Sequence, residues 1–264
     1  MQNTGSDAGY RSATYDRQLL LSGSKRNAVL ELWEVQRYGS DSYGDTDYVS
    51  IYGMQPSAWY AEGIRLLGRT AVECTRDQLG EAIGNDIAAI VGTSSAMTGA
   101  FVIDLFAGSA NTLFWVLRNL PGARGVGFEL DPMVYELTRR NLATLSVPID
   151  IVNTDYASGL RDIAIPADQP LIAFIAPPWG DALSQASGLD LQHTTPPITQ
   201  VLDDIVLRFP RSRLLCAVQV YESVNSASLT EVMRRFDWTT LHVYPLNEPG
   251  ANHGSLLGTR GWVP

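Results

Sequence analysis

The sequence has few of the residues from which metal sites and disulfides are built. Its 264 residues include two cysteines and three histidines. Cys74 and Cys216 lie far apart in the chain and do not form a metal-binding spacing, and the histidines form no close cluster. We therefore expect no bound metal and two buried, reduced thiols, which is typical of a cytoplasmic protein.

Long apolar runs and an excess of positive charge are also missing. No stretch approaches the roughly 18 apolar residues of a membrane span, and we find no signal peptide, so we expect a cytoplasmic protein without a membrane partner. The 28 aspartate and glutamate residues outnumber the 19 lysine and arginine residues, which gives a net charge of −9. A long nucleic-acid footprint needs clustered basic residues, so this charge disfavours a nucleic-acid partner, although a local basic patch is compatible with it.

The chain does contain enough apolar material for a full core. Hydrophobic residues make up 45% of it, which fits one α/β domain with an appendage. From residue 100 onward, strand-like segments alternate with helix-like ones, which predicts a mostly parallel sheet with helices on both faces. The predicted strands are Phe101–Leu105, Gly125–Leu130, Ile149–Asn153, Leu171–Ile175, Leu214–Tyr221, Trp238–Tyr244 and Ser255–Trp262, the last two as an antiparallel pair.

Helices are predicted between these strands and in the N-terminal part of the chain. Those of the sheet region are Asn111–Leu120, Pro132–Leu145, Ile198–Phe209 and Ser226–Phe236. Residues 1–99 are predicted to form a small, mainly helical cap whose first few residues are disordered. Its expected elements are a helix over Asn27–Tyr38, a loop over Gly39–Asp47, a strand over Tyr48–Tyr52, helices over Ser57–Leu67 and Thr75–Val91, and a hinge over Gly92–Gly99.

The stretch Phe101–Asn111, FVIDLFAGSAN, has the pattern of a nucleotide-type site. A buried strand runs into a turn of small residues, and a helix follows at once. Small residues let a ligand approach the backbone, and the free N–H groups at the helix N-terminus face it.

Chemically useful residues also stand at the ends of the next three strands. Glu129 ends the second strand, 21 residues beyond Gly108, where a carboxylate can accept both hydroxyls of a ribose. Asp155 and Tyr156 follow the third strand, and Ala176-Pro-Pro-Trp follows the fourth. Ligands of open α/β sheets bind beyond the carboxyl ends of strands. Each acid could instead be a helix N-cap, but the order and spacing of all four signals favour one ligand crevice.

Four motifs resemble motifs I to IV of the class I S-adenosylmethionine-dependent methyltransferases: DLFAGSAN, GFELDP, NTDY and APPWG. They look most like the RNA cap guanine-N2 methyltransferases (trimethylguanosine synthase-like), whose motifs read D-x-F-x-G-x-G-x-N and S-P-P-W-G-G. LWEVQRY at Leu32–Tyr38 is similar to a W-x-x-Q-R-Y segment of that family, and Gln55–Ile64 stands where the family has its T-P-E-x-I-A helix. The core resemblance covers about Ala100–Pro264.

The resemblance implies a fold and a cofactor. The fold would be α/β and Rossmann-like: a seven-stranded, mostly parallel sheet with one antiparallel strand, helices on both faces, and a small helical cap. Residues 1–99 would form the N-terminal extension and cap or lid, and residues 100–264 the catalytic domain that binds S-adenosyl-L-methionine.

The resemblance also implies roles by position. Gly108 and its neighbours would approach the methionine part of the cofactor, and Asp104 would orient their turn or receive the amino group through water. Glu129 would hold the ribose and Asp155 the adenine amino group, with Tyr156 or Phe128 against the ring. The implied cofactor-binding set is Asp104, Phe106, Ala107, Gly108, Asn111, Glu129, Leu130, Asp155, Tyr156 and Ala176.

The implied catalytic set lies beyond the fourth strand and consists of Pro177, Pro178, Trp179 and Asp181. Trp179 would stack on a flat or cationic acceptor, or would pack at the rim of the pocket. Trp33, in the cap, is expected to pack in the core or lid.

Three departures from the family pattern bear on the acceptor. Ala110 stands where the family often has a second glycine, which is tolerable only if φ stays negative there. Ala176 stands where amino-methylating relatives carry Asn, Asp or Ser, so only backbone carbonyls remain to receive the target amine. Asp181 replaces the second glycine of W-G-G. Together with the acidic charge, these changes favour a small-molecule acceptor over capped RNA.

The predicted activity is methyl transfer to N or O of a small metabolite. In-line placement supplies most of the catalysis, and a neutral amine needs no base. A phenol or ammonium would need one, and the unranked candidates are Asp181, His193, Tyr221, Glu222 and His253. The alternatives are aminocarboxypropyl transfer, intramolecular cyclisation that releases methylthioadenosine, guanine-N2 methylation, and a non-catalytic module that partners another subunit. The acceptor and the oligomeric state stay open.

Overall fold

A seven-stranded sheet organises the computed structural model, which describes residues 15–166, 168–184, 186–245 and 252–264. The strand order is β3-β2-β1-β4-β7-β9-β8. The strands are β1 Phe101–Asp104, β2 Arg124–Glu129, β3 Asp150–Asn153, β4 Leu171–Ile175, β7 Leu214–Tyr221, β8 Trp238–Tyr244 and β9 His253–Arg260. All neighbours from β3 to β7 pair in parallel, whereas β9 is antiparallel to both β7 and β8. The predicted sheet with one antiparallel strand is confirmed.

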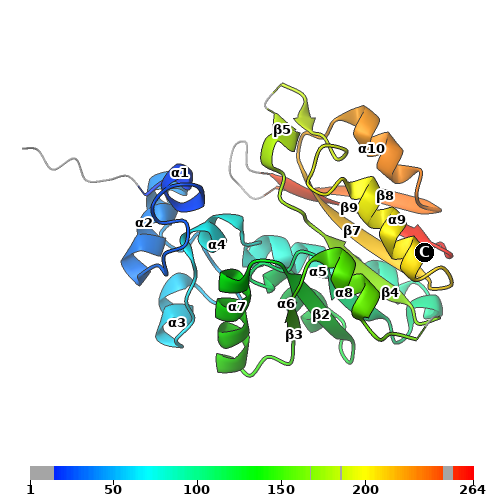
Figure 1. Ribbon diagram of the computed structural model, residues 1–264, viewed down its shortest axis with the longest axis horizontal. Helices are drawn as coiled ribbons and strands as arrows, with labels where there is room; N and C mark the ends of the chain where they lie inside the picture. The colour runs from blue at the N-terminus through cyan, green and yellow to red at the C-terminus, as the bar shows by residue number, and fades with distance from the viewer. Residues whose placement is uncertain (1–14, 167, 185, 246–251) are drawn as a thin grey trace, which may run out of the picture.

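Helices cover both faces of this sheet (Figure 1), because successive side chains of a buried strand point to opposite faces. In β4, Ile172 and Phe174 join one apolar cluster, and Ala173 and Ile175 join the other. The first cluster includes residues of α5 Asp77–Gly92, α6 Asn111–Asn119 and α7 Pro132–Thr144. The second includes residues of α8 Tyr156–Asp162, α9 Ile198–Arg208 and α10 Ser226–Met233.

The N-terminal part is helical, as predicted, but its boundaries differ. Its helices α1 to α4 lie together at one end of the molecule, next to α7 (Figure 1). They are α1 Arg17–Leu21, α2 Leu32–Tyr43, α3 Pro56–Ala61 and α4 Gly68–Glu73. The expectation of disorder in the first few residues falls outside the described part of the chain.

Three predictions for the cap are wrong, each for a local reason. Helix α2 begins at Leu32 because the Glu34 carboxylate accepts the Glu31 N–H, and it continues to Gly44, whose φ of +72° ends it. The predicted loop therefore begins five residues too early. No strand forms over 48–52, since Ile51 pairs with Met54 across a tight turn. The predicted helix over 57–67 is broken after Ala61, and Gly63 has a φ of +89°.

Several short elements were not predicted. They are the helices α1, α4 and α8, the 3-10 turns η1 Ser95–Met97 and η2 Gly180–Ala182, and the small hairpin of β5 Leu183–Ser184 and β6 Gly188–Leu189. The hairpin and η2 directly follow the Pro-Pro-Trp turn, so they stand between the fourth strand and α9.

The cap and the sheet share one apolar cluster. It joins Leu30, Tyr38 and Trp59 of the cap to Val102 and Leu113 of the sheet region. Trp33 does not take part in the way we expected, because its side chain is 55% exposed. The division of the chain into 1–99 and 100–264 stays a prediction.

Asp77, the first residue of α5, fastens the cap to the start of α6. Its carboxylate accepts hydrogen bonds from Asn111 Nδ2 at 3.0 Å, Trp115 Nε1 at 2.7 Å and the Gly53 N–H at 2.9 Å. Asn111 Nδ2 also donates to the Thr75 carbonyl, and Asn111 Oδ1 accepts the Tyr52 N–H. One carboxylate therefore holds three segments that are far apart in the sequence.

We predict that Asp77→Ala lowers the free energy of unfolding by about 2–4 kcal/mol, because it leaves partly buried donors without an acceptor. Urea denaturation measures this loss. Asp162→Ala is the matched control: its carboxylate is exposed and pairs with exposed Arg161, so its effect should stay within about 0.5 kcal/mol. Equal losses in the two variants would contradict the role of Asp77.

Candidate functional site

The carboxyl ends of β1 and β2 are joined through the carboxylate of Glu129. Its Oε2 accepts the Gly108 N–H at 2.9 Å and its Oε1 accepts the Asp131 N–H at 2.7 Å. Gly108 belongs to the turn after β1, and Asp131 is the N-cap of α7. The sheet order reverses between β1 and β4, so this junction lies at the topological switch point, where α/β sheets bind their ligands.

Two residues of the turn after β1, separated by Ser109, have a left-handed backbone conformation. Gly108 has a φ of +52° and Ala110 a φ of +57°. The condition under which alanine would be tolerable here, a negative φ, is therefore not met. The backbone has the conformation that glycine favours, and the methyl group is accommodated with strain. Ala110 is also the N-cap of α6 and donates its N–H to the Ala107 carbonyl.

Side chains from outside the turn hold it in this shape. Tyr52 of the cap donates its hydroxyl to the Ser109 carbonyl, and Thr138 of α7 donates to the Gly108 carbonyl at 2.8 Å. Asn111, predicted to bind the cofactor, uses its whole amide on Tyr52, Thr75 and Asp77. Sequence reasoning missed Tyr52 and Thr138, because contacts 57 and 30 residues apart leave no local pattern.

Two carboxylates of the site, buried Asp104 and half-buried Glu129, have raised pKa values. Asp104 is 1% exposed and accepts the Phe106 N–H at 3.2 Å. Burial raises the pKa of Asp104 to about 7, and the nearby charge of Glu129 adds to the effect. Burial also raises the pKa of Glu129, although the two backbone N–H groups that donate to its carboxylate lower it. Both acids would be stabilised by a cation or by hydroxyl donors.

Asp155 behaves as a helix N-cap. It accepts the Ser158 N–H at 2.9 Å, and this bond holds the pKa of its carboxyl below the usual range. The N-cap interpretation that we set beside the adenine role is thus satisfied.

Apolar and aromatic groups flank these acids. Leu130, directly after Glu129, is 70% exposed, and Met133 and Val152 on the neighbouring elements are also exposed. Tyr156 packs on Phe106 with ring centroids 5.5 Å apart, and its hydroxyl donates to Asp204 Oδ2 at 2.8 Å. Phe128 is a buried core residue, which leaves Tyr156 as the accessible ring.

Beyond β4 the predicted acceptor residues form an aromatic cluster. Pro177 is buried, whereas Pro178 and Asp181 are exposed, and Ala176 brings no polar side chain. Trp179 stacks on His253 with centroids 5.3 Å apart and planes at 26°, and it meets Tyr221 edge-on at 6.2 Å. His253, one of the unranked base candidates, is the first residue of β9.

The other base candidates are less well placed or already paired. His193 pairs with Asp190 at 2.9 Å and its side chain is 76% exposed. Asn252 Nδ2 donates to Glu222 Oε2 at 2.7 Å. Among the described residues, no group of three or more His, Cys, Asp and Glu side chains could hold a metal ion, and no helix is long and apolar enough to cross a membrane.

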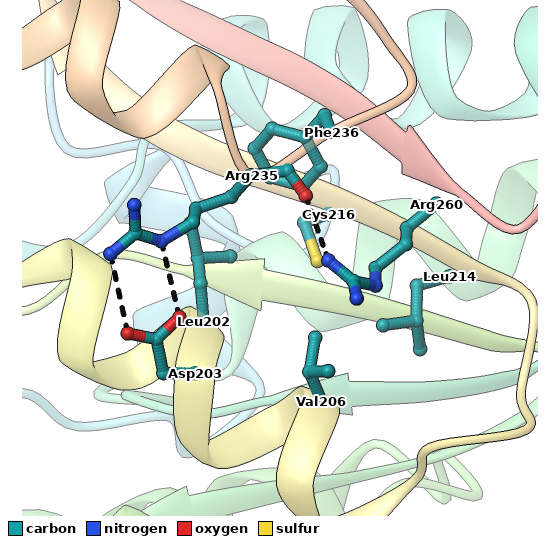
Figure 2. Close-up of a pocket in the computed structure, with 8 residues that line it drawn as sticks. All are labelled: Leu202, Asp203, Val206, Leu214, Cys216, Arg235, Phe236 and Arg260. Carbon is teal, nitrogen blue, oxygen red and sulfur yellow. Dashed lines mark hydrogen bonds and ion pairs between the residues drawn. The ribbon is translucent and has the colours of Figure 1, made fainter.

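A small cavity lies between residues of α9, such as Leu202 and Val206, and residues of β7 and β9 (Figure 2). Its lining includes Leu214, the first residue of β7, and Arg260, the last residue of the antiparallel β9. Its volume of about 10 Å³ suits at most one water molecule. It is therefore a packing defect between α9, the segment that follows α10 and the sheet, away from the carboxyl ends of the parallel strands.

Comparison with solved structures identifies the fold. A structure of the METTL16 MTase domain gives a TM-score of 0.50 at 16% identity, over 69% of this chain and 66% of that one. The N-terminal domain of human METTL16 in complex with SAH gives 0.48 at 16% identity, over 69% of each chain. Precorrin-6y C5,15-methyltransferase from Geobacter metallireducens gives 0.44 at 13% identity, over 72% of this chain and 90% of that one.

The chain thus has the Rossmann-like fold of class I S-adenosylmethionine-dependent methyltransferases, and it spans about two thirds of the METTL16 MTase domain structure. The sequence itself matches no protein-family model and no curated protein. The trimethylguanosine synthase-like subfamily is not confirmed. We expected nucleic acid to be disfavoured as a partner, and these comparisons do not support that expectation.

We predict that Ala110→Gly raises the free energy of unfolding by about 0.5–1 kcal/mol, because relief of the left-handed strain exceeds the loss of one buried methyl group. Urea denaturation measures the gain. Ala89→Gly, at an exposed position inside α5, is the control and should lose about 1 kcal/mol. A loss in both variants would show that Ala110 is not strained.

We predict that Asp104→Asn stabilises the ligand-free protein at pH 8 but not at pH 4. The folded pKa of about 7 lies above the unfolded value of about 3.9. Between these values the folded state keeps a proton that the unfolded state has lost, so wild-type stability falls as pH rises. Asparagine cannot ionise, and its advantage should grow to at most about 4 kcal/mol above pH 7.

Urea denaturation at both pH values tests this. Asp155→Asn is the control with the opposite sign, because the pKa of Asp155 is lowered and the ionised form stabilises the fold. It should lose stability at pH 8. If the stability difference between Asp104→Asn and the wild type does not change with pH, the Asp104 carboxyl does not have a raised pKa in the folded protein.

Proposed function

We propose that this protein binds S-adenosyl-L-methionine at the ends of β1, β2 and β3 and transfers its methyl group to N or O of a small-molecule acceptor. The observation that carries the proposal is the position of Glu129, which ends β2 and bonds to Gly108 of the turn after β1. Each carboxylate oxygen accepts one backbone N–H and keeps capacity for another donor. Two ribose hydroxyls would complete this set.

The electrostatics of the site support a cationic cofactor. Asp104 and Glu129 are both destabilised as anions by burial. A ligand that carries a sulfonium and an ammonium group would favour their charged forms. We assign the methionine part to Gly108 and its neighbours, with Asp104 orienting that turn.

The adenine would lie beyond Glu129. Leu130 offers an exposed apolar surface for one face of the ring, which would explain why so large an apolar side chain stands in the open. Asp155 would accept the adenine amino group while it caps α8. Tyr156 would lie near the ring edge, held by Asp204 and Phe106.

The chemistry needs placement more than acid–base catalysis. The sulfonium carbon is activated when the cofactor is bound, so in-line alignment of the acceptor supplies most of the rate. Ala176 offers no side-chain acceptor for an amine, so the carbonyls of Ala176 and Pro177 would receive its hydrogens. Pro177, Pro178, Trp179 and Asp181 would shape the acceptor side of the pocket.

Two alternatives have a specific observation behind them. The Pro-Pro-Trp turn resembles that of the RNA cap guanine-N2 methyltransferases, which favours a guanine acceptor. The missing polar side chain at residue 176 favours chemistry in which the cofactor itself is consumed, either by aminocarboxypropyl transfer or by cyclisation that releases methylthioadenosine. We place the activity in the cytoplasm, with residues 1–99 as the cap of the catalytic domain.

We predict that the wild-type protein binds S-adenosylhomocysteine by calorimetry and that Glu129→Ala weakens binding at least about tenfold, because two charge-assisted hydrogen bonds are lost. Glu136→Ala is the control: this exposed carboxylate pairs with Arg139 and Arg140 and should leave the affinity unchanged. Absence of binding to the wild type, or an unaffected Glu129→Ala, would contradict the cofactor assignment.

The same protein, incubated with S-adenosylmethionine and no acceptor, separates the alternatives. Methyl transfer predicts that the cofactor persists, whereas cyclisation predicts methylthioadenosine in proportion to time and enzyme. Chromatography of the products decides between them.

A further inference from the structure

We propose that His253 positions Trp179, and that the ring stack they form presents Trp179 to a planar acceptor. The role of Trp179 toward an acceptor rests on the proposed methyltransferase function. His253 itself would touch Trp179 and not the reacting atoms, so it is a positioning residue and not a catalytic base.

The sheet topology brings the three rings together. Trp179 follows β4, Tyr221 ends β7 and His253 begins β9, and these strands are neighbours in the sheet. Tyr221 and His253 are directly paired in the antiparallel ladder. Trp179 stacks on His253 at 5.3 Å, and Tyr221 meets both rings edge-on, at 6.2 Å and 6.3 Å. These distances are typical of favourable aromatic pairs.

His253 is itself held by a side chain of the neighbouring strand β7. Its Nδ1 lies 3.1 Å from Gln219 Nε2. Gln219 stands two residues before Tyr221 on β7, so both side chains project from the same face of the strand. One orients the imidazole by a hydrogen bond and the other by its ring edge. When the amide donates to Nδ1, the proton of the neutral imidazole is on Nε2.

The surroundings keep His253 neutral. Burial lowers the pKa of His253 to about 4, Arg76 and Arg17 act in the same direction, and Glu222 opposes them. A neutral imidazole ring is planar, and it can stack on indole without the free-energy cost of removing a charge from water. With this pKa, His253 is also a poor base near pH 7. Its chemistry therefore fits support of Trp179 better than proton transfer.

The fixed indole points to the class of acceptor. Trp179 is only partly buried, so the residue stays partly accessible to a ligand while its ring stacks on His253. A ring that is held before binding loses little conformational freedom on binding. A planar heteroaromatic acceptor would gain the full stacking contact, whereas a non-planar aliphatic amine would gain only a fraction of it.

The test uses the full chain saturated with S-adenosylhomocysteine and two probes. 4-Aminoquinoline represents planar heteroaromatic amines, and cyclohexylamine represents non-planar amines. The variants are His253→Ala, which removes the stack, and His253→Phe, which keeps a ring but no nitrogen. His193→Ala is the control, since His193 is exposed and pairs with Asp190. The readouts are the dissociation constants of both probes and of S-adenosylhomocysteine.

We expect 4-aminoquinoline to bind the wild type at least tenfold more tightly than cyclohexylamine does. His253→Ala should lose at least fivefold in affinity for 4-aminoquinoline, while His253→Phe and His193→Ala stay within twofold. The affinity for S-adenosylhomocysteine should be the same in all four proteins. Because the chain has three histidines, their ring proton signals are readily assigned by NMR, and 4-aminoquinoline should shift that of His253.

Equal affinity of the two probes, or an unchanged affinity in His253→Ala, would overturn the proposal. A loss in His253→Phe as large as that in His253→Ala would also overturn it, because the nitrogen atoms and not the stack would then matter. If S-adenosylhomocysteine binds normally in these cases, only this proposal fails. If the wild type does not bind S-adenosylhomocysteine, the proposed function fails with it.

Discussion

The hydrogen bond between Glu129 and Gly108 is the contact on which the candidate site depends. Parallel pairing places the ends of β1 and β2 side by side, and this bond joins the turns that follow them. A partly buried carboxylate is costly without donors, and here two backbone N–H groups supply part of what it needs. The bond therefore orders both turns and leaves an acidic group, incompletely satisfied, at the topological switch point of the sheet.

The cap contributes directly to the shape of this site. Tyr52 satisfies the Ser109 carbonyl, and Asp77 anchors Asn111 at the start of α6. These contacts offset the strain of a left-handed alanine at position 110, which the local sequence would not adopt by preference. Strained backbone persists where the surrounding structure over-determines it, and such places are often functional. Tyr52 and Asp77 of the cap thus help to hold the turn after β1 in its conformation.

The sheet could be predicted from the sequence almost residue by residue, because buried parallel strands are continuous apolar runs that small or acidic residues terminate. The predicted bounds of β4, β7 and β8 agree with the structure. The cap was harder, since α2 begins at a glutamate pair, not at a typical capping residue, and Tyr48–Tyr52 has the composition of a strand but forms a turn. Contacts such as Tyr52 to Ser109, or Trp179 to His253, join segments more than fifty residues apart. No local pattern encodes them. Strand β9 also begins two residues before its predicted start at Ser255, so the prediction left His253 outside the sheet.

The chemistry of the site divides at the switch point of the sheet. On the side of β1, β2 and β3 stand carboxylates whose raised or lowered pKa values reflect burial and backbone donors. On the side of β4, β7 and β9 stand the rings of Trp179, Tyr221 and His253. The lowered pKa of His253 keeps its imidazole neutral. A cationic, hydroxyl-rich ligand matches the first side, and a planar one matches the second. Since Ala176 contributes no polar group between them, selection of the acceptor would depend on the shape of the aromatic side more than on hydrogen bonds.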